Sequence, residues 1–244
     1  MTVDSDPPGE PAATDPADLA GMMSRVARSL QEEHGDVEST LHTITSTAVG
    51  LVPGAGHCTV TYVTGRRSVE ARAATGDLPR LVDQTQNDLG EGPCLDSVWE
   101  QRTVRIDDMR AEQRWPRFAR AAAARGALSS LSFQLFVQGD TLGALNVYAE
   151  TPHAFGEESE DVGLLLASHA AVALAGAQHE ENLQRALSSR DLIGQAKGIL
   201  MERFRLTGDQ AFQVLARVSQ QTNRKLVDIA DELCTSGALP GPSS

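Results

Sequence analysis

The spacing of hydrophobic residues changes along the chain and separates helical regions from β-rich ones. Between residues 19 and 52, apolar side chains recur every three or four positions, which predicts helical segments interrupted at His34-Gly35-Asp36. From Thr59 the apolar residues alternate, which predicts a strand that pairs through a turn at 65–67 with a second strand over 69–75. The same reasoning predicts further elements, namely a short strand over 103–106, a second hairpin over 131–148, and helices within 78–100 and over 115–125.

The region after Pro152 is predicted to be mostly helical. No proline occurs in the 87 residues between Pro152 and Pro240, and this stretch is rich in Ala, Leu, Glu and Gln. Residues 157–204 are predicted to form one helix of about 70 Å at 1.5 Å per residue, long enough to link two domains or to pair with a second copy. Two shorter helices should follow, the first capped by Thr207 with Gln210 and the second by Asn223. The core of this C-terminal unit is predicted to contain Ala196, Ile199, Phe204, Ala211, Phe212, Leu215, Ile229 and Ala230.

Charge is distributed unevenly. The net charge is −12, yet residues 1–185 hold 14 basic and 27 acidic residues, whereas residues 186–244 hold seven basic and six acidic ones. The proline-rich, acidic residues 1–18 are predicted to be a disordered tail, and 239–244 a second tail. The chain shows no signal-peptide pattern and no apolar run of the roughly 18 residues that span a membrane. We therefore expect a cytoplasmic protein that does not contact a membrane.

The sequence offers little catalytic chemistry. The three cysteines form no CxxC pair, the six histidines show no metal-ligand spacing, and no nucleotide-binding or hydrolase motif is present. We expect no metal site and no enzymatic activity. Cys94, which follows Gly-Glu-Gly-Pro, admits two interpretations: an oxidant-sensing thiol of lowered pKa at a helix start, or a small buried side chain beside a tight turn. The second is favoured, and a redox role for Cys58 or Cys94 stays open.

The segment 190–204 is the most informative part of the chain. Arg190 and Lys197 fall outside its apolar stripe, and Gly194 and Gly198 lie in mid-helix, where each costs about 1 kcal/mol relative to alanine. Glycines at this spacing allow another helix or a backbone to approach closely. One interpretation is a solvated amphipathic helix. The other is a modest cationic surface that also includes Arg217, Arg224 and Lys225.

Three blocks in the C-terminal part resemble an ANTAR domain. They are Gln-Ala-Lys-Gly-Ile-Leu-Met-Glu-Arg at 195–203, Asp-Gln-Ala-Phe-Gln-Val-Leu at 209–215 and Asn-Arg-Lys-Leu-Val-Asp-Ile-Ala at 223–230. The resemblance implies a three-helix module of a bacterial antiterminator, which binds tandem RNA hairpins with six-nucleotide loops and so prevents a terminator from forming. On this resemblance we expect Lys197 and Arg203 to contact the RNA backbone, Gln195 a base edge, and Arg224 and Lys225 a phosphate at the start of the third helix, with Arg190 as a further RNA-binding residue. Because this region is only weakly basic, affinity would have to come from a local patch and from dimerisation.

The region over about 36–180 resembles a GAF domain. The resemblance rests on the order of the predicted elements and on the motifs at 90–94, 114–118 (Arg-Trp-Pro-Arg-Phe) and 142–148 (Leu-Gly-Ala-Leu-Asn-Val-Tyr). It implies a sensory and dimerising module that holds a small molecule, but no cofactor is identified by these motifs. The chain has no phosphoacceptor receiver domain, so aspartate phosphorylation is not the expected input.

Together these resemblances predict an α+β protein with two domains. A GAF domain over 19–180, an antiparallel sheet flanked by helices, is joined by the long helix to an all-α three-helix ANTAR bundle over 181–238. The expected function is that of a signal-responsive, homodimeric RNA-binding antiterminator, in which a small-molecule ligand or a redox event in the GAF domain changes how two long helices pair. The alternative is a small-molecule or redox sensor that acts on protein partners through its helical C-terminal module. A GAF-type sulfoxide reductase would require reactive cysteines.

Overall fold

The computed structural model describes residues 36–63, 69–100, 103–137 and 140–239, together with Gly21, Ser24 and Arg28. The chain divides into two compact units, residues 1–178 and 179–244, and each is considered by itself below. The predicted tail over 1–18 and nearly all of the helical segment predicted before Asp36 lie outside the described residues.

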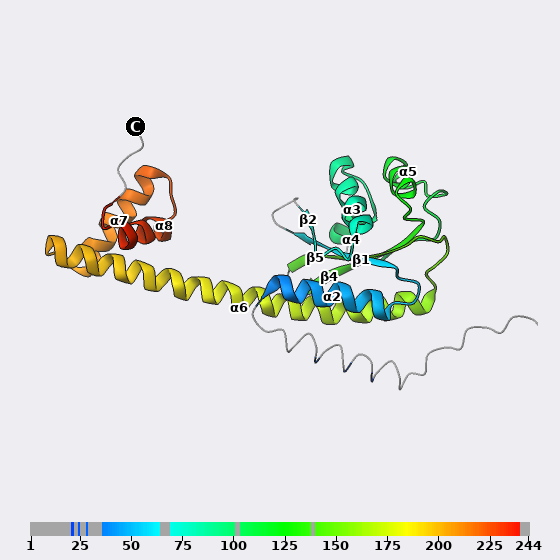
Figure 1. The fold of residues 1–244 in the computed structure, drawn as a ribbon, viewed down its shortest axis with the longest axis horizontal. Coiled ribbons are helices and arrows are strands. Elements are labelled where there is room, and N and C mark those ends of the chain that lie inside the picture. Colours follow the sequence, from blue (N-terminus) through cyan, green and yellow to red (C-terminus); the bar gives the residue numbers. More distant parts are fainter. Residues whose placement is uncertain are drawn as a thin grey trace, which may run out of the picture. The chain divides into compact units, whose positions relative to one another are not determined.

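The first unit is built on a five-stranded antiparallel sheet (Figure 1). Its strands follow the order β2-β1-β5-β4-β3, with bounds β1 His57–Val63, β2 Val69–Arg72, β3 Val104–Ile106, β4 Ser129–Val137 and β5 Asp140–Ala149. The two hairpins predicted from alternating hydrophobicity are present as the β1/β2 and β4/β5 pairs. The short strand predicted over 103–106 is β3, which pairs with β4 at the edge of the sheet.

Helices cover both faces of this sheet. The helices α2 (Val37–Leu51) and α6 (Glu157–Phe204, through its first half) lie on one face. On the other face lie α3 (Asp77–Leu89), α4 (Pro93–Glu100) and α5 (Pro116–Ala124) (Figure 1). The helix α2 begins where the sequence pattern breaks, because the Asp36 carboxylate accepts hydrogen bonds from the backbone N–H groups of Glu38 and Ser39.

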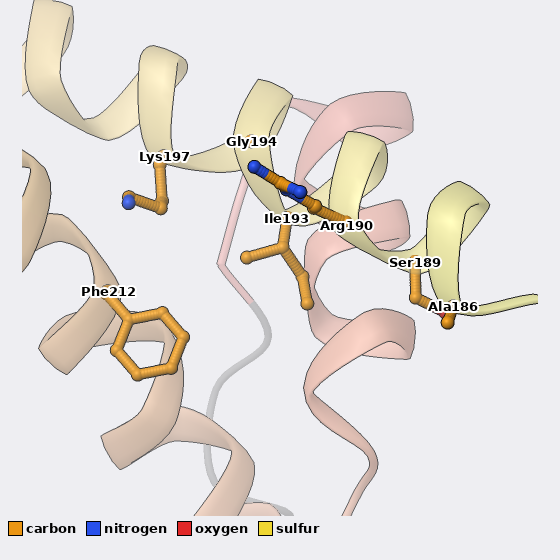
Figure 2. A pocket seen from close by; sticks show the side chains of 7 residues that line it. All are labelled: Ala186, Ser189, Arg190, Ile193, Gly194, Lys197 and Phe212. Atoms are coloured by element: carbon orange, nitrogen blue, oxygen red, sulfur yellow. The ribbon is translucent and has the colours of Figure 1, made fainter. Parts of the chain in front are cut away.

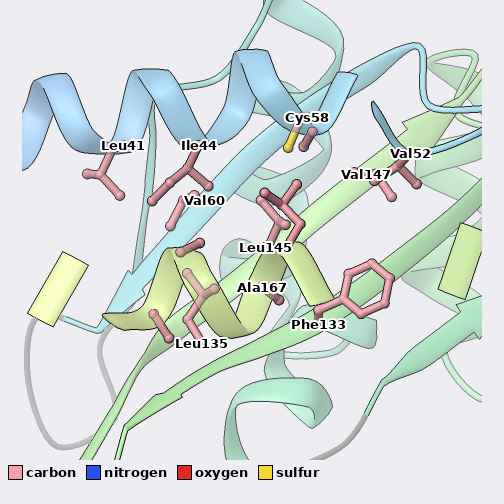
Figure 3. Close-up of a cluster of buried hydrophobic side chains, with 14 of the residues drawn as sticks. Leu41, Ile44, Val52, Cys58, Val60, Phe133, Leu135, Leu145, Val147 and Ala167 are labelled. Atoms are coloured by element: carbon pink, nitrogen blue, oxygen red, sulfur yellow. The ribbon is translucent and has the colours of Figure 1, made fainter. Parts of the chain in front are cut away.

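The two faces of the sheet differ in chemistry. Side chains that face α2 and α6 are apolar and form the main core, which Figure 3 shows between the sheet and the two helices. The core residues contributed by the strands include Val60, Leu131, Phe133, Leu135, Leu145 and Val147. Successive residues of a strand point to opposite faces. The intervening positions are therefore turned towards α3, α4 and α5, and they include the buried residues Thr59, Thr61, Ser130, Ser132, Asn146 and Tyr148. A polar layer is thus enclosed within the first unit.

The helix α6 runs without interruption over 48 residues, as predicted. Three glutamates, Glu157, Glu158 and Glu160, occupy its first turn, where negative charge is favourable. By length and composition alone α6 is apolar enough to cross a membrane, contrary to the expectation from the sequence. However, 44% of that apolar stretch is buried within the structure, and core helices of soluble proteins have the same composition. This is weak evidence for a membrane span.

The second unit consists of the C-terminal part of α6, α7 (Gly208–Thr222) and α8 (Leu226–Ser236). Its core holds Ala196, Leu200, Ala211, Leu215, Ile229, Ala230 and Leu233, which confirms five of the predicted packing residues, and Ile199 is half-buried against them. The predicted capping box is also present. The Thr207 hydroxyl accepts from the Gln210 backbone N–H, and the Thr207 N–H donates to the Gln210 side chain at 2.9 Å.

Three predictions for this unit were wrong. Phe204 and Phe212 are not core residues, since 56% and 39% of their surfaces are exposed. Phe204 is the last residue of α6, and the chain turns away at Arg205, which has a positive φ. Asn223 does not cap α8 but ends α7, where it adopts the left-handed conformation that asparagine tolerates. Lys225 precedes α8 instead and makes no side-chain cap.

Candidate nucleic-acid interface and sensory layer

A groove of about 460 Å³ lies between α6 and α7 in the second unit (Figure 2). Six of its lining residues come from α6 and one from α7, namely Ala186, Ser189, Arg190, Ile193, Gly194, Lys197 and Phe212. The α6 residues recur at spacings of three and four, so they share one face of the helix. The groove therefore combines two cationic side chains, an aromatic ring and a glycine.

Among the described residues, the cationic side chains of the groove form no ion pair with an acidic side chain. Within the described part of the second unit, the ion pairs are Arg185–Glu181 at 2.6 Å and Arg224–Glu232 at 2.7 Å, and neither involves a residue of the groove. Arg190 and Lys197 lie two helical turns apart, and Figure 2 shows them on either side of Gly194. Two positive charges that line one groove and form no ion pair among the described residues favour a ligand with more than one negative charge.

The structure brings together two of the six residues predicted to bind RNA, Arg190 and Lys197. Arg203 donates a hydrogen bond to the backbone carbonyl of Gly237, so its guanidinium group holds the end of α8. Arg224 is paired with Glu232. Gln195 and Lys225 are exposed but do not line the groove.

Phe212 is the groove residue that sequence reasoning assigned wrongly. Ala211 faces the core of the unit, and the next residue of a helix lies about 100° further round. This rotation takes the Phe212 ring out of the core and onto the wall of the groove opposite Lys197 (Figure 2). The periodicity of Ala211 and Leu215 could have indicated this position.

A second candidate site is the polar layer of the first unit, which is centred on the carboxylate of Asp83 on α3. This fully buried group accepts hydrogen bonds from the Thr61 hydroxyl (2.9 Å), from the amides of Gln86 (3.1 Å) and Asn146 (3.2 Å), and from the Tyr148 hydroxyl. No ion pair to Asp83 is found among the described residues. Burial raises the pKa of Asp83 to about 6, although the four hydrogen bonds oppose this shift.

The polar layer also contains hydrogen-bonding capacity that is not used. Over the described residues, three buried oxygen atoms have no hydrogen-bond partner: Ser130 Oγ, Ser132 Oγ and Asn146 Oδ1. Ser132 and Asn146 are opposite each other in the β4/β5 pair, and Ser130 is two positions along the same face. Buried polar atoms are ordinarily paired, so a water molecule or a small polar ligand fits the chemistry of this layer. No group of three or more His, Cys, Asp or Glu side chains within the described ranges could hold a metal ion.

Comparison with domain families identifies both units. A GAF domain model matches residues 34–175, more than half of the chain, and an ANTAR domain model matches residues 181–233. The chain belongs to the GAF family and carries an ANTAR domain. Because GAF domains are sensory modules and ANTAR domains are RNA-binding modules of antiterminators, the domain composition is that of a sensor-regulated antiterminator.

Solved structures share the GAF fold. The GAF domain of an Acinetobacter phosphoenolpyruvate-protein phosphotransferase is 14% identical (TM-score 0.51), with 67% of this chain and 97% of that chain covered. That of the Coxiella burnetii phosphoenolpyruvate-protein phosphotransferase is 17% identical (TM-score 0.53; 67% and 96% covered). Free methionine-R-sulfoxide reductase from Neisseria meningitidis is 16% identical (TM-score 0.52; 69% and 95% covered). At such identities the likeness shows the fold alone. A comparison with curated proteins gave no match.

Both cysteines of the GAF domain, Cys58 and Cys94, are buried. The Cys94 thiol donates to the Thr61 hydroxyl at 3.0 Å, and its backbone N–H donates to the Gln86 side chain at 2.9 Å. Burial raises the pKa of Cys94 and of Cys58, and the nearby charge of Asp83 raises both further. The interpretation of Cys94 as a thiol of lowered pKa is therefore wrong, because burial outweighs its position near the start of α4.

We expect thiol-specific reagents to modify the native protein at Cys234 alone, because this side chain is half-buried whereas Cys58 and Cys94 are enclosed. Titration with a chromogenic disulfide should release about one equivalent rapidly, and the remaining two only after the protein unfolds. The Cys234→Ser variant is the control and should show no rapid phase. A rapid phase in that variant would contradict the burial of the GAF cysteines and would revive a redox role.

Proposed function

We propose that this protein is a signal-responsive transcription antiterminator whose ANTAR domain binds tandem hexaloop hairpins of leader RNA. Binding would prevent a terminator from forming, and the GAF domain would control binding in response to a small molecule. The observation that carries the proposal is the groove of the ANTAR domain, where Arg190 and Lys197, which form no ion pair among the described residues, lie beside an exposed aromatic ring.

In this proposal Arg190 and Lys197 contact phosphate groups. Each such contact releases counterions from the RNA, so affinity falls as salt rises. Gln195 and Lys225, both exposed, remain proposed as a base-edge contact and a phosphate contact. Arg203 and Arg224 already have partners within the ANTAR domain, so we assign them to holding α8 in place.

The proposed active form is a homodimer that pairs through α6. Several large apolar side chains of this helix are exposed, namely Leu164, Leu165, Val172, Leu183 and Leu187. A second copy would remove them from water, which is favourable. Two ANTAR domains would then bind two hairpins, and linkage of two weak sites raises avidity by about 10²–10⁴ when the geometry fits. A ligand in the polar layer around Asp83 would act by changing that geometry.

The test is binding of the full-length protein to a tandem-hexaloop RNA and to a single-hairpin RNA over a salt series. We expect binding to the tandem RNA to be about 100-fold tighter. Arg190→Ala and Lys197→Ala should each weaken binding about tenfold and lower the salt slope by about one, with an unchanged melting temperature. Arg185→Ala is the matched control, because Arg185 is a basic residue of the same helix that pairs with Glu181 outside the groove.

Two results would count against the proposal. Equal loss of RNA affinity in Arg185→Ala would show that the groove has no special role. Failure of the unaltered protein to bind either RNA at low salt would instead support the other function, in which the helical C-terminal module docks onto a protein partner.

A further inference from the structure

The glycines in the ANTAR part of α6 serve no packing purpose within the chain. A Cβ atom built on Gly194 or on Gly198 meets no atom within 4 Å, and both residues have the backbone conformation of an ordinary helix. Alanine would fit at either position and would favour the helix more strongly than glycine does. The absence of a side chain at these positions therefore has no explanation within the isolated chain.

Gly194 differs from Gly198 in its surroundings, because it lines the groove. Phe212 stands on the opposite wall with 39% of its surface exposed, and Ile193 contributes an apolar surface beside it (Figure 2). In Figure 2 the Arg190 side chain extends towards Gly194 and the Lys197 side chain lies above Phe212, so two cationic groups and an aromatic ring border the groove around the Gly194 backbone. Such a site fits a flat, apolar group that carries a negative charge on each side.

We propose that the groove holds one unpaired RNA base, stacked on Phe212 and lying over the Gly194 backbone, while Arg190 and Lys197 hold the phosphates on its two sides. The inference rests on the RNA-binding function proposed above and specifies the part of the RNA that is recognised. Proteins recognise RNA sequence chiefly through unpaired bases of loops, and aromatic side chains are the usual stacking partners of these bases. An acidic peptide would match the charges but would gain little from the exposed ring.

The sharpest test compares Gly194→Ala with Gly198→Ala. Both variants should melt at the temperature of the unaltered protein or above it, because alanine favours the helix and nothing obstructs its Cβ atom. Only Gly194→Ala places a methyl group in the groove. We expect it to weaken binding of the tandem-hexaloop RNA about tenfold, or about 1.4 kcal/mol, whereas Gly198→Ala binds as the unaltered protein does.

Stacking on Phe212 is tested separately with 2-aminopurine, a fluorescent base, placed in turn at each loop position of the RNA. One position should lose fluorescence when the unaltered protein binds, as a base does when it stacks. Phe212→Leu should abolish this quenching and weaken binding about tenfold, while Phe212→Trp preserves both. Phe204→Leu is the control, because Phe204 is exposed outside the groove.

The outcomes separate the inference from the function on which it rests. If the unaltered protein does not bind RNA, the proposed function fails. If it binds RNA but Gly194→Ala and Gly198→Ala bind equally well, or lose the same affinity, the inference is overturned. Quenching that persists in Phe212→Leu also overturns it.

Discussion

Replacing Asp83 with asparagine is expected to remove a pH-dependent destabilisation of about 3 kcal/mol that develops between pH 4 and pH 7. Asp83 is fully buried in the polar layer, and burial raises its pKa to about 6. In the unfolded chain its pKa is about 3.9. Two pKa units correspond to about 3 kcal/mol, because one unit is about 1.4 kcal/mol.

The direction of the effect follows from proton binding. Below about pH 4 the carboxyl group is protonated in both states, and above about pH 6 it is ionised in both. Between these values the folded state holds a proton that the unfolded state has lost, so the free energy of unfolding falls as the pH rises. The contribution of Asp83 is therefore more favourable at pH 4 than at pH 7, which is opposite to the usual behaviour of a carboxylate in an ion pair.

The measurement is urea unfolding of the unaltered protein and of Asp83→Asn from pH 4 to pH 7.5. The difference between their free energies of unfolding should change by about 3 kcal/mol in favour of the variant as the pH rises. Taking the difference between the two proteins cancels the pH dependence that other groups contribute to both. One such group is Asp108, whose pKa is lowered to about 2 by hydrogen bonds from Arg110. Asp77→Asn is the matched control, because it removes an exposed carboxylate of the same helix that pairs with Arg80 outside the polar layer, and it should not reproduce the change seen with Asp83→Asn. A flat difference for Asp83→Asn would show that its four hydrogen bonds outweigh burial.

Gly163→Ala and Gly176→Ala should change stability in opposite directions, although both make the same substitution in α6. A Cβ atom on Gly163 would lie 2.2 Å from Cζ of Phe133, whose ring is fully buried between α6 and the sheet. Overpacking of a core costs about 1–3 kcal/mol. The gain in helix propensity offsets about 1 kcal/mol of this. We expect a net loss of about 1 kcal/mol, and of at most about 2 kcal/mol.

At Gly176 nothing lies within 4 Å of the added methyl group, so alanine should stabilise the protein by up to about 1 kcal/mol. Denaturant unfolding of both variants measures the contrast. Phe133→Leu shortens the opposing side chain, so the double variant with Gly163→Ala should be more stable than the sum of the two single changes predicts. Equal stability of Gly163→Ala and Gly176→Ala would show that the helix shifts freely over the sheet.

Much of the fold follows from local sequence signals. Alternating hydrophobicity predicted both hairpins, the lack of proline predicted the uninterrupted α6, and Thr207 with Gln210 predicted the start of α7. Each of these signals acts between residues close together in the chain, through side-chain direction, backbone freedom or a capping hydrogen bond. Asn223 shows the limit of such signals, since asparagine suits both ends of a helix and the prediction chose the wrong end.

The candidate sites depend on residues that are distant in sequence. Seven basic residues of the C-terminal region look alike in the sequence, but Arg203 is held by Gly237, 34 positions away, and Arg224 by Glu232. Arg190 and Lys197 form no ion pair within the described residues and line a groove instead. The exposure of Phe212 depends on which side of α7 packs against α6 and α8.

By itself, the sequence determined the order of elements, the two domains and the presence of cationic residues on α6, because periodicity and local motifs encode these features. Only the tertiary structure decided which cations are free, that Phe212 faces a groove, and that Asp83 is buried. In the sequence, Asp83 resembles an ordinary surface carboxylate of a helix. In the structure, its carboxylate accepts hydrogen bonds from Thr61 and Tyr148, which are 22 and 65 positions away in the chain. Burial and pairing arise from such long-range contacts, which no local pattern specifies.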